Sequence, residues 1–174
     1  TVGARRLDRG AEVAGDRHGR QLDLLDQLDE AAVRALVPEL RAQNVESVAF
    51  AFLHSYANPA HEQAVGELIR REFPALFVSL SSEVVAELRE YPRAVTTCAN
   101  AYVQPLMDRY LANLERELAA RGFRGALHLM HSAGGLVSPA AARKFPIRLL
   151  ESGPAGGGLA TALFGRLAGE ERVI

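Results

Sequence analysis

The chain has 174 residues, of which 48% are hydrophobic and 24% charged, and its formal net charge is −1. These values are typical of a soluble globular protein with one core or two small ones, and they exclude the basic excess expected for binding nucleic acid or an anionic membrane surface. Cys98 is the only cysteine, so an intrachain disulfide framework is excluded. No apolar run approaches the roughly 20 residues of a membrane span. We therefore predict a cytoplasmic protein with no nucleic-acid or membrane partner.

The two ends of the sequence differ from its middle. Residues 1–26 carry many charges and scattered glycines, with short β-like pieces that have no obvious partner nearby. The sequence EERVI (170–174) stops as a new apolar strand begins. We interpret the chain as a piece of something longer. We expect residues 1–26 to be mobile or to pair with a neighbouring molecule, which would cause self-association, because an unpaired strand edge invites pairing.

The next four elements alternate in type, and their apolar patterns predict a helix over 29–44, a strand over 47–54, a helix over 58–73 and a strand over 76–85. Asp29 and Asn58 are the expected N-caps of the two helices, and Asn44 is the expected stop of the first. Pro38 should kink or split that first helix. The strand over 47–54 is almost continuously apolar, as in a parallel sheet covered on both faces. The order predicts a right-handed unit of strand, crossover helix and strand.

A long helical pattern follows over 91–123 and contains two prolines. Pro92 is placed to start one helix and Pro105 to start a second, while Gly122 occupies the position of a left-handed C-terminal cap. Ser138 is the expected N-cap of a later short helix. After residue 123 we expect a strand over 126–131, a loop over 132–136, that short helix over 138–145, and a strand or extended entry over 146–151.

Three consecutive glycines, Gly156 to Gly158, stand in the sequence LLESGPAGGGLATALFG (149–165) at the start of an apolar helix pattern. Each interior helical glycine costs roughly 1 kcal/mol of stability relative to alanine. We therefore expect that a ligand or another element comes close to the backbone at these positions. The stretch lacks the Lys and Ser or Thr of a P-loop and matches a dinucleotide fingerprint only weakly. Two interpretations remain. In the first, a helix begins near Pro154, capped by Ser152 or Gly153, and its N-terminus faces an anion. In the second, the glycines serve close helix packing through Gly156, Gly157, Ala160 and Thr161.

The remaining polar candidates do not form a self-sufficient active site. His128 and His131 are three residues apart on the expected strand, so they point to opposite faces and cannot chelate one metal without a bend. Cys98 has no basic neighbour in sequence, which favours a packed thiol over a nucleophile. Ser132 lacks the flanking glycine pattern of a nucleophile elbow. The sequence therefore predicts no metal site.

Several motifs in the same order resemble the hydantoinase A and oxoprolinase family, which includes N-methylhydantoinase subunits, 5-oxoprolinases and the acetone carboxylase beta subunit. The stretches that carry the resemblance are FAFLHSYANPAHE (50–62), SSEVVAELREYPRAVTTCANAYVQP (81–105), MHSAGGLVSPAAARKFPIRLL (130–150) and ESGPAGGGLATA (151–162). The resemblance extends over residues 29–174. One departure is HSAGG (131–135), which stands where the family pattern has a glutamine and an asparagine around the serine.

The resemblance implies an α/β fold of the actin, sugar kinase and heat-shock chaperone type, RNase H-like with a mostly parallel sheet and crossover helices. Such a fold holds ATP and Mg²⁺ between two lobes. It also implies ATP-driven cleavage of a cyclic amide, such as a hydantoin or 5-oxoproline, in which phosphorylation turns a stable amide oxygen into a leaving group. Family members often work with a second large subunit.

The family's phosphate loops have the form Asp-x-Gly-Gly-Thr, which occurs nowhere in these 174 residues. We therefore expect this chain alone to bind no cofactor and to be inactive. On the same basis, residues 1–91 are expected to be the C-terminal part of the family's N-terminal domain, and residues 92–174 the beginning of its hydantoinase A domain.

The resemblance places eight residues near the nucleotide or the interlobe cleft: Ser132, Gly134, Gly135, Glu151, Ser152, Gly153, Gly156 and Gly157. Ser152 is expected to cap the helix, and its glycines to let the helix start approach the cleft. Glu151 is expected either to meet a metal-bound water or a substrate group, or to be a solvated or capping carboxylate. The catalytic residues stay unassigned. Two alternatives stay open, an α/β scaffold or subunit-docking module without catalysis of its own, and a ketone carboxylase subunit.

Overall fold

A computed structural model of the chain describes residues 28–170 and residue 172. The expectations for residues 1–26 and for a strand at the end of the chain fall outside this description. In chain order the elements are α2 (Glu30–Ala42), β1 (Ser47–Phe50), α3 (Ala60–Glu72), β2 (Phe77–Leu80), α4 (Ser81–Val84), α5 (Glu90–Ala120), β3 (Leu129–Met130), β4 (Leu136–Val137), α6 (Pro139–Lys144), the 3₁₀ helix η1 (Pro146–Leu149) and α7 (Ser152–Ala168).

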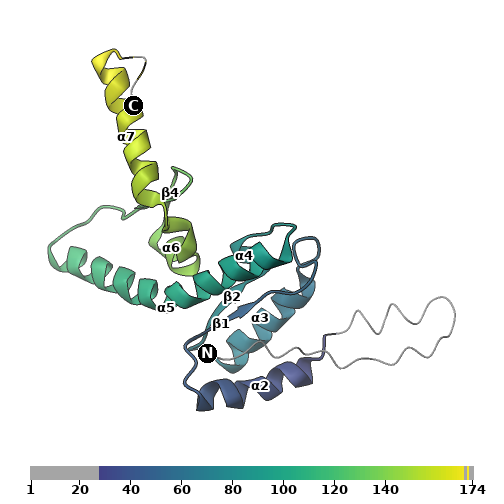
Figure 1. The fold of residues 1–174 in the computed structure, drawn as a ribbon. Coiled ribbons are helices and arrows are strands. Elements are labelled where there is room, and N and C mark those ends of the chain that lie inside the picture. The colour runs from purple at the N-terminus through teal and green to yellow at the C-terminus, as the bar shows by residue number, and fades with distance from the viewer. Residues whose placement is uncertain (1–27, 171, 173–174) are drawn as a thin grey trace.

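The predicted order of strand, crossover helix and strand is confirmed, but both strands are shorter than predicted. The strands expected over 47–54 and 76–85 end at Phe50 and Leu80, and residues 81–84 form the helix α4 instead. β1 and β2 pair in parallel, from Ser47 opposite Phe77 to Phe50 opposite Leu80, and α3 connects them. α2 and α3 lie beside this pair (Figure 1). The core is formed by side chains from α2, from α3, from β2 and from the residue just before β2: Val33, Val37, Val65, Leu68, Ile69, Leu76, Val78 and Leu80. Burial of these aliphatic side chains holds the first half of the described chain together.

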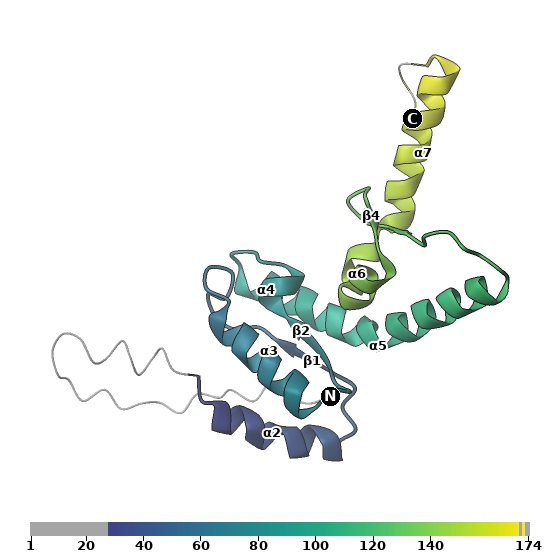
Figure 2. The same ribbon diagram turned by 180° about the vertical axis from the view of Figure 1, so that it is seen from behind.

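The two faces of the sheet differ in polarity. Val78 and Leu80 point to the face covered by α3 and belong to the apolar core. Ser79, between them, points to the other face, where its hydroxyl donates to Oε1 of Gln104 on α5 at 3.1 Å. The alternation of a strand therefore places α3 on one face and α5 on the other, an arrangement that Figure 2 shows from behind.

The two predicted ends of α2 follow the local signals, but the predicted N-cap of α3 is wrong. α3 begins at Ala60 with Pro59 in the N-cap position, while Oδ1 of Asn58 accepts from the amide of Ala60 at 3.1 Å. Asp29 caps α2, since its Oδ1 accepts from the amide of Ala32 at 2.9 Å. Asn44 has a positive φ of 51° just past the end of the helix, as expected for a stop. Pro38 was expected to kink or split the helix, and the split is wrong, because α2 runs through this proline. Val33 and Val37 are buried in the core, so tertiary packing holds the helix together despite one missing N–H.

α5 is one helix of 31 residues, although the sequence predicted a second helix starting at Pro105. Pro105 is buried, and the helix contacts β1, β2, α6 and η1 along its length, so packing maintains its direction through the proline. The predicted cap at Gly122 is confirmed by a φ of 80° and by a hydrogen bond from the amide of Phe123 to the carbonyl of Leu118.

The last part of the chain is more helical than predicted. Two short strands, β3 and β4, pair antiparallel, and Ser138 caps α6 as expected, accepting from the amide of Ala141 at 3.3 Å. The strand predicted over 146–151 is wrong, because its first four residues form η1. The amide of Ile147 donates to Oδ1 of Asn100 on α5, so this backbone finds its partner outside a sheet. Within the described residues, no helix is both long and apolar enough to cross a membrane.

Candidate functional site

The structure brings together the two segments that the sequence placed near a cleft. The hydroxyl of Ser132 donates to the carbonyl oxygen of Arg148 at 2.6 Å, and it accepts from the amide of Glu151 at 3.1 Å. The amide of Ser132 also donates to Arg148, at 2.8 Å. Ser132 therefore fastens the 131–135 loop to the entry of α7.

The 131–135 loop is closed by its own hydrogen bonds. The amide of His131 donates to the carbonyl of Gly135 at 2.7 Å, and the amide of Gly134 to that of His131 at 2.8 Å. Gly134 has a φ of 85°, which only glycine adopts at little cost. Nδ1 of His131 accepts from the amide of Ala133 at 2.9 Å. The loop is thus a tight turn, and it lies at the side of α7, where a Cβ added at Gly134 would lie 3.6 Å from Cδ1 of Leu159.

The glycines of α7 are not explained by packing within the described residues. A Cβ added at Gly153, Gly157 or Gly158 would meet no atom within 4 Å. At Gly156 the nearest atom would be Cγ of Met130 at 3.7 Å, an ordinary contact. The first turns of α7 are therefore open on the side of these glycines, which favours an approaching ligand or chain segment over packing inside these residues.

The predicted cap of α7 is wrong in detail. The helix begins at Ser152, and the N-cap position is Glu151, whose side chain makes no capping hydrogen bond. Pro154 is consequently the third helical residue and not the first. Leu150 already has helical angles at the end of η1, so the chain enters α7 without the extended residue from which Ser152 or Gly153 would cap. The carboxylate of Glu151 is exposed.

Arg148 anchors this site to the first half of the fold, and sequence reasoning missed it. Its guanidinium donates to the carbonyl oxygens of Glu83 and Val84, both at 3.0 Å, and its Cζ lies over the ring of Phe145, 4.4 Å from the ring centroid. Because α4 is a single turn, its last carbonyl groups lack helical partners, and Arg148 satisfies two of them. Nothing in the local sequence pattern marks this role.

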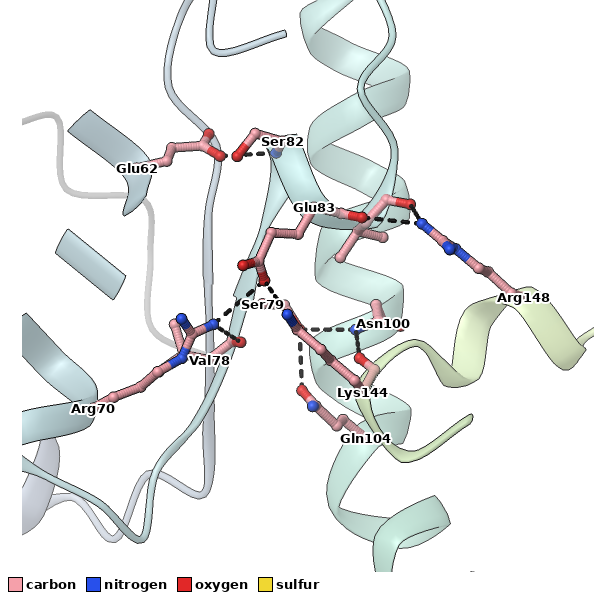
Figure 3. Close-up of polar contacts among 11 residues, drawn as sticks. Glu62, Arg70, Val78, Ser79, Ser82, Glu83, Asn100, Gln104, Lys144 and Arg148 are labelled. Atoms are coloured by element: carbon pink, nitrogen blue, oxygen red, sulfur yellow. Dashed lines mark hydrogen bonds and ion pairs between the residues drawn. The ribbon is translucent and has the colours of Figure 1, made fainter. Parts of the chain in front are cut away.

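A second contact joins the same two regions through Glu83 (Figure 3). Its carboxylate lies 3.4 Å from the guanidinium of Arg70 and 3.1 Å from Nζ of Lys144. The amide of Asn100 donates to Ser79 at 2.9 Å and to the carbonyl of Lys144 at 3.1 Å. α6 and η1 are therefore held against both β2 and α5, which fixes the position of the segment that leads into α7.

A buried ionic cluster lies where the chain leaves β1 and β2. Oε1 of Glu62, which is fully buried, accepts from the amide of Phe52 at 2.7 Å and from the hydroxyl of Ser81 at 2.6 Å, and Oε2 accepts from the amide of Ser82 at 2.8 Å. Nε of Arg93, also buried, donates to the hydroxyl of Ser81 at 3.0 Å. One serine hydroxyl thus connects a buried carboxylate to a buried guanidinium.

The pKa of Glu62 reflects this environment. Burial acts to raise it, but the hydrogen bonds from Ser81 and from the amides of Phe52 and Ser82 outweigh burial, so the pKa lies below its ordinary value. Glu62 is therefore ionised at neutral pH and balances the charge of Arg93. The cluster is a structural element, since the groups that satisfy Glu62 leave no free face toward solvent.

The described residues around the loop and α7 carry few groups suited to catalysis. No three His, Cys, Asp or Glu side chains anywhere in residues 28–170 lie close enough together to bind one metal ion. The site offers backbone amides at the start of a helix, an exposed carboxylate at Glu151, and an imidazole at His131. Backbone amides at a helix start suit an anion, but they do not form a complete site by themselves.

Comparison with known proteins assigns both halves of the chain to one family. The profile described as hydantoinase/oxoprolinase matches residues 93–174, and the profile described as the hydantoinase/oxoprolinase N-terminal region matches residues 7–73. The helix α5 lies almost wholly in the first of these matches, yet it packs on the sheet formed by β1 and β2. The two regions therefore share one packed body in this structure.

Three relatives show the range of proteins that contain a similar region. The chain is 37% identical to caprolactamase subunit alpha of Pseudomonas jessenii, covering 74% of this chain and 18% of that protein. It is 39% identical to 5-oxoprolinase of Saccharomyces cerevisiae, covering 80% and 10%. It is 30% identical to the acetophenone carboxylase gamma subunit of Aromatoleum aromaticum, covering 84% and 20%. The chain thus spans a fifth or less of the length of these relatives.

Two solved structures are similar over most of the chain. ATP-dependent caprolactamase from Pseudomonas jessenii superposes with a TM-score of 0.71 at 36% identity, covering 79% of this chain and 20% of that one. Nucleotide-free acetone carboxylase superposes with a TM-score of 0.66 at 27% identity, covering 82% and 20%. The expected fold class is confirmed: the described residues are part of an α/β fold of the actin-like ATPase type. The chain belongs to the hydantoinase/oxoprolinase family.

Proposed function

We propose that the protein containing this chain is an ATP-dependent hydrolase that opens a cyclic amide. The observation that carries this proposal is the similarity, at 36% identity and a TM-score of 0.71, to an ATP-dependent caprolactamase. Similarity to 5-oxoprolinase supports it independently, because caprolactam and 5-oxoproline share an amide bond inside a ring. ATP and Mg²⁺ are the cofactors of the proposed reaction, and ATP would supply the phosphoryl group that makes the amide oxygen a leaving group.

In this proposal the 131–135 loop and the first turns of α7 lie at the interlobe cleft, near the nucleotide. The open space beside Gly153 and Gly157 supports such a place, because it lets another molecule or segment reach the backbone. Ser132 then serves to fix the loop against the entry of α7. The described residues do not fit a complete site for ATP and Mg²⁺, since they contain no cluster of metal ligands. We therefore assign no catalytic residue.

We further propose that the protein acts with a second large subunit in the cytoplasm. The names of two relatives, caprolactamase subunit alpha and acetophenone carboxylase gamma subunit, describe proteins that are themselves subunits. The division into an N-terminal domain up to residue 91 and a hydantoinase A domain from residue 92 is part of the same proposal. It is supported by the two profile matches, which end at residue 73 and begin at residue 93.

A second candidate reaction is ATP-dependent carboxylation of a ketone. It is favoured by the 30% identity to the acetophenone carboxylase gamma subunit and by the superposition on acetone carboxylase. A scaffold without catalysis is the third alternative, in which the glycines of α7 serve only the docking of another segment.

The test is an assay of the full-length protein together with its second subunit. ADP release is measured with caprolactam, 5-oxoproline and hydantoin, and separately with acetone and acetophenone in the presence of bicarbonate. Ring opening is monitored by mass spectrometry. We expect it to accompany ADP release only with the cyclic amides. Carboxylated product from a ketone would establish the second candidate instead, and absence of ADP release with every substrate would refute both.

A further inference from the structure

The long helix α5 turns its polar side toward the interior. Its buried residues include Arg93, Thr97, Asn100 and Gln104, spaced by three or four residues, so they lie on one face of the helix. Each of them has a hydrogen-bond partner. Arg93 bonds to Ser81, Thr97 bonds to the carbonyl of Arg93, and Asn100 and Gln104 both bond to Ser79. The face that packs on β1 and β2 is therefore hydrogen-bonded and largely polar.

The opposite face of α5 is apolar and exposed. Tyr91, Val95, Tyr102 and Leu106 are exposed by 80%, 49%, 84% and 65%. Cys98, between them, is exposed as well, in contrast to the packed thiol that the sequence predicted. Their spacing of four, three, four and four residues places them on a single stripe along the helix. We call these five residues the outer stripe of α5.

The charge pattern of α5 is that of an interior helix. Residues 94–107, nearly four turns, contain no Asp, Glu, Lys or Arg. A helix that faces water on one side normally carries charged residues there, whereas one without them is buried on all sides. The outer stripe exceeds the scattered single apolar side chains that a protein surface tolerates. Exposure of this face of α5 to water is therefore unfavourable.

We infer that the outer stripe of α5 is covered in the complete protein by another part of the same polypeptide. The region that matches this chain makes up only 10% to 22% of the relatives and structural neighbours, so their chains are several times longer. Most of such a polypeptide lies outside these residues and is tethered to them. Tethering gives the rest of that polypeptide a high effective concentration at the outer stripe, which favours its binding there over the binding of a separate chain.

The stripe defines the chemistry of what covers it. From Tyr91 to Leu106 it is about 22 Å long, so the covering element needs roughly four helical turns or the face of a sheet. It has to be apolar and free of charge along its centre. Because buried tyrosine hydroxyls usually find partners, it also has to offer hydrogen-bond groups to Tyr91 and Tyr102, about 16 Å apart along the helix axis.

Cys98 reports directly on the accessibility of the stripe. The full-length protein without its second subunit is treated with iodoacetamide under native conditions, and the tryptic peptide of residues 94–109 is quantified by mass spectrometry. We expect Cys98 to react about 100-fold more slowly than in the 174-residue chain, and at the same rate once the full-length protein is denatured. Equal rates in the two native proteins would overturn the inference.

A charge in the stripe provides the second measurement. Tyr102→Lys is made in the full-length protein and in the 174-residue chain, with Ala119→Lys, an exposed position on the same helix, as the control. We expect Tyr102→Lys to lower the melting temperature of the full-length protein by at least about 5 °C or to prevent its folding, and to leave the short chain and both control proteins unchanged.

Two other outcomes would overturn the inference by showing that a different molecule covers the outer stripe. If full-length Tyr102→Lys keeps its stability but no longer binds the second subunit, the stripe docks that subunit. If it keeps its stability but changes from dimer to monomer in sedimentation, the stripe joins two copies of the chain. Unchanged stability with no change in assembly would leave the stripe exposed, contrary to the inference.

Discussion

Replacing Glu62 by glutamine should destabilise the fold strongly, because the carboxylate satisfies three donors at once. Oε1 accepts from the amide of Phe52 and the hydroxyl of Ser81, and Oε2 from the amide of Ser82. A glutamine amide places an NH₂ group opposite at least one of these donors, whichever way it is turned. It also removes the charge that balances buried Arg93. An unsatisfied buried donor costs about 1–3 kcal/mol, and an unbalanced buried charge adds to it, so we expect a total of about 3 kcal/mol.

The assay is thermal unfolding of the 174-residue chain followed by circular dichroism. A loss of about 3 kcal/mol corresponds to a decrease of about 10 °C in the melting temperature for a protein of this size. Glu67→Gln is the matched control, because Glu67 is exposed on the same helix and should change stability little. A decrease below about 2 °C for Glu62→Gln would refute the role assigned to the cluster.

The pH dependence of the same variant gives an independent check. The pKa of Glu62 is lowered in the folded state, so its contribution to stability is complete above the ordinary carboxyl pKa and is lost as the pH falls through the folded value. The difference in unfolding free energy between the wild type and Glu62→Gln should therefore be constant near neutral pH and shrink under acidic conditions. A difference that grows on acidification would show that the carboxylate is not the stabilising form.

Three further predictions concern the helix ends and the candidate site. Gly157→Ala should stabilise this chain by about 1 kcal/mol, since the new methyl group meets no atom within 4 Å; in the full-length protein the same variant should lose ATP-dependent turnover if the bare backbone faces a ligand, and unchanged turnover would remove that interpretation. Ser132→Ala should expose the amide of Glu151 to faster hydrogen exchange, because the hydroxyl that accepts from it is gone; an unchanged exchange rate would contradict the contact. Asp29→Ala should lower stability by about 1 kcal/mol in urea unfolding while Asp29→Asn, which keeps the capping oxygen, should not.

The elements set by neighbouring residues were predicted well. The caps at Asp29 and Ser138 and the left-handed turn at Gly122 depend on hydrogen bonds between residues at most five positions apart, so the local pattern contains their cause. The errors at Pro38 and Pro105 have the opposite origin. A proline removes one hydrogen bond locally, but the helix around each of them is held by contacts with distant elements.

The features of the candidate site also divide into those that the sequence predicted and those that only the structure shows. Its composition, with the glycines of α7 and the 131–135 turn, was readable from the sequence, and the resemblance to the hydantoinase/oxoprolinase family named both segments. The bonds that join them run from Ser132 to Arg148 and Glu151, across 16 and 19 residues. No periodicity signals a contact of that separation.

The sequence by itself determined the family through its motifs. It also determined the parallel βαβ unit, the N-caps at Asp29 and Ser138 and the left-handed turn at Gly122, because periodicity and capping act over a few residues. Only the tertiary structure decided that Glu62 and Arg93 share one buried serine, that Arg148 closes the end of α4, and that α5 turns its polar face inward. Each of these depends on which surfaces meet when the chain packs. A buried polar group is stable only where its partners arrive from other elements, and the order of residues along the chain does not contain that information.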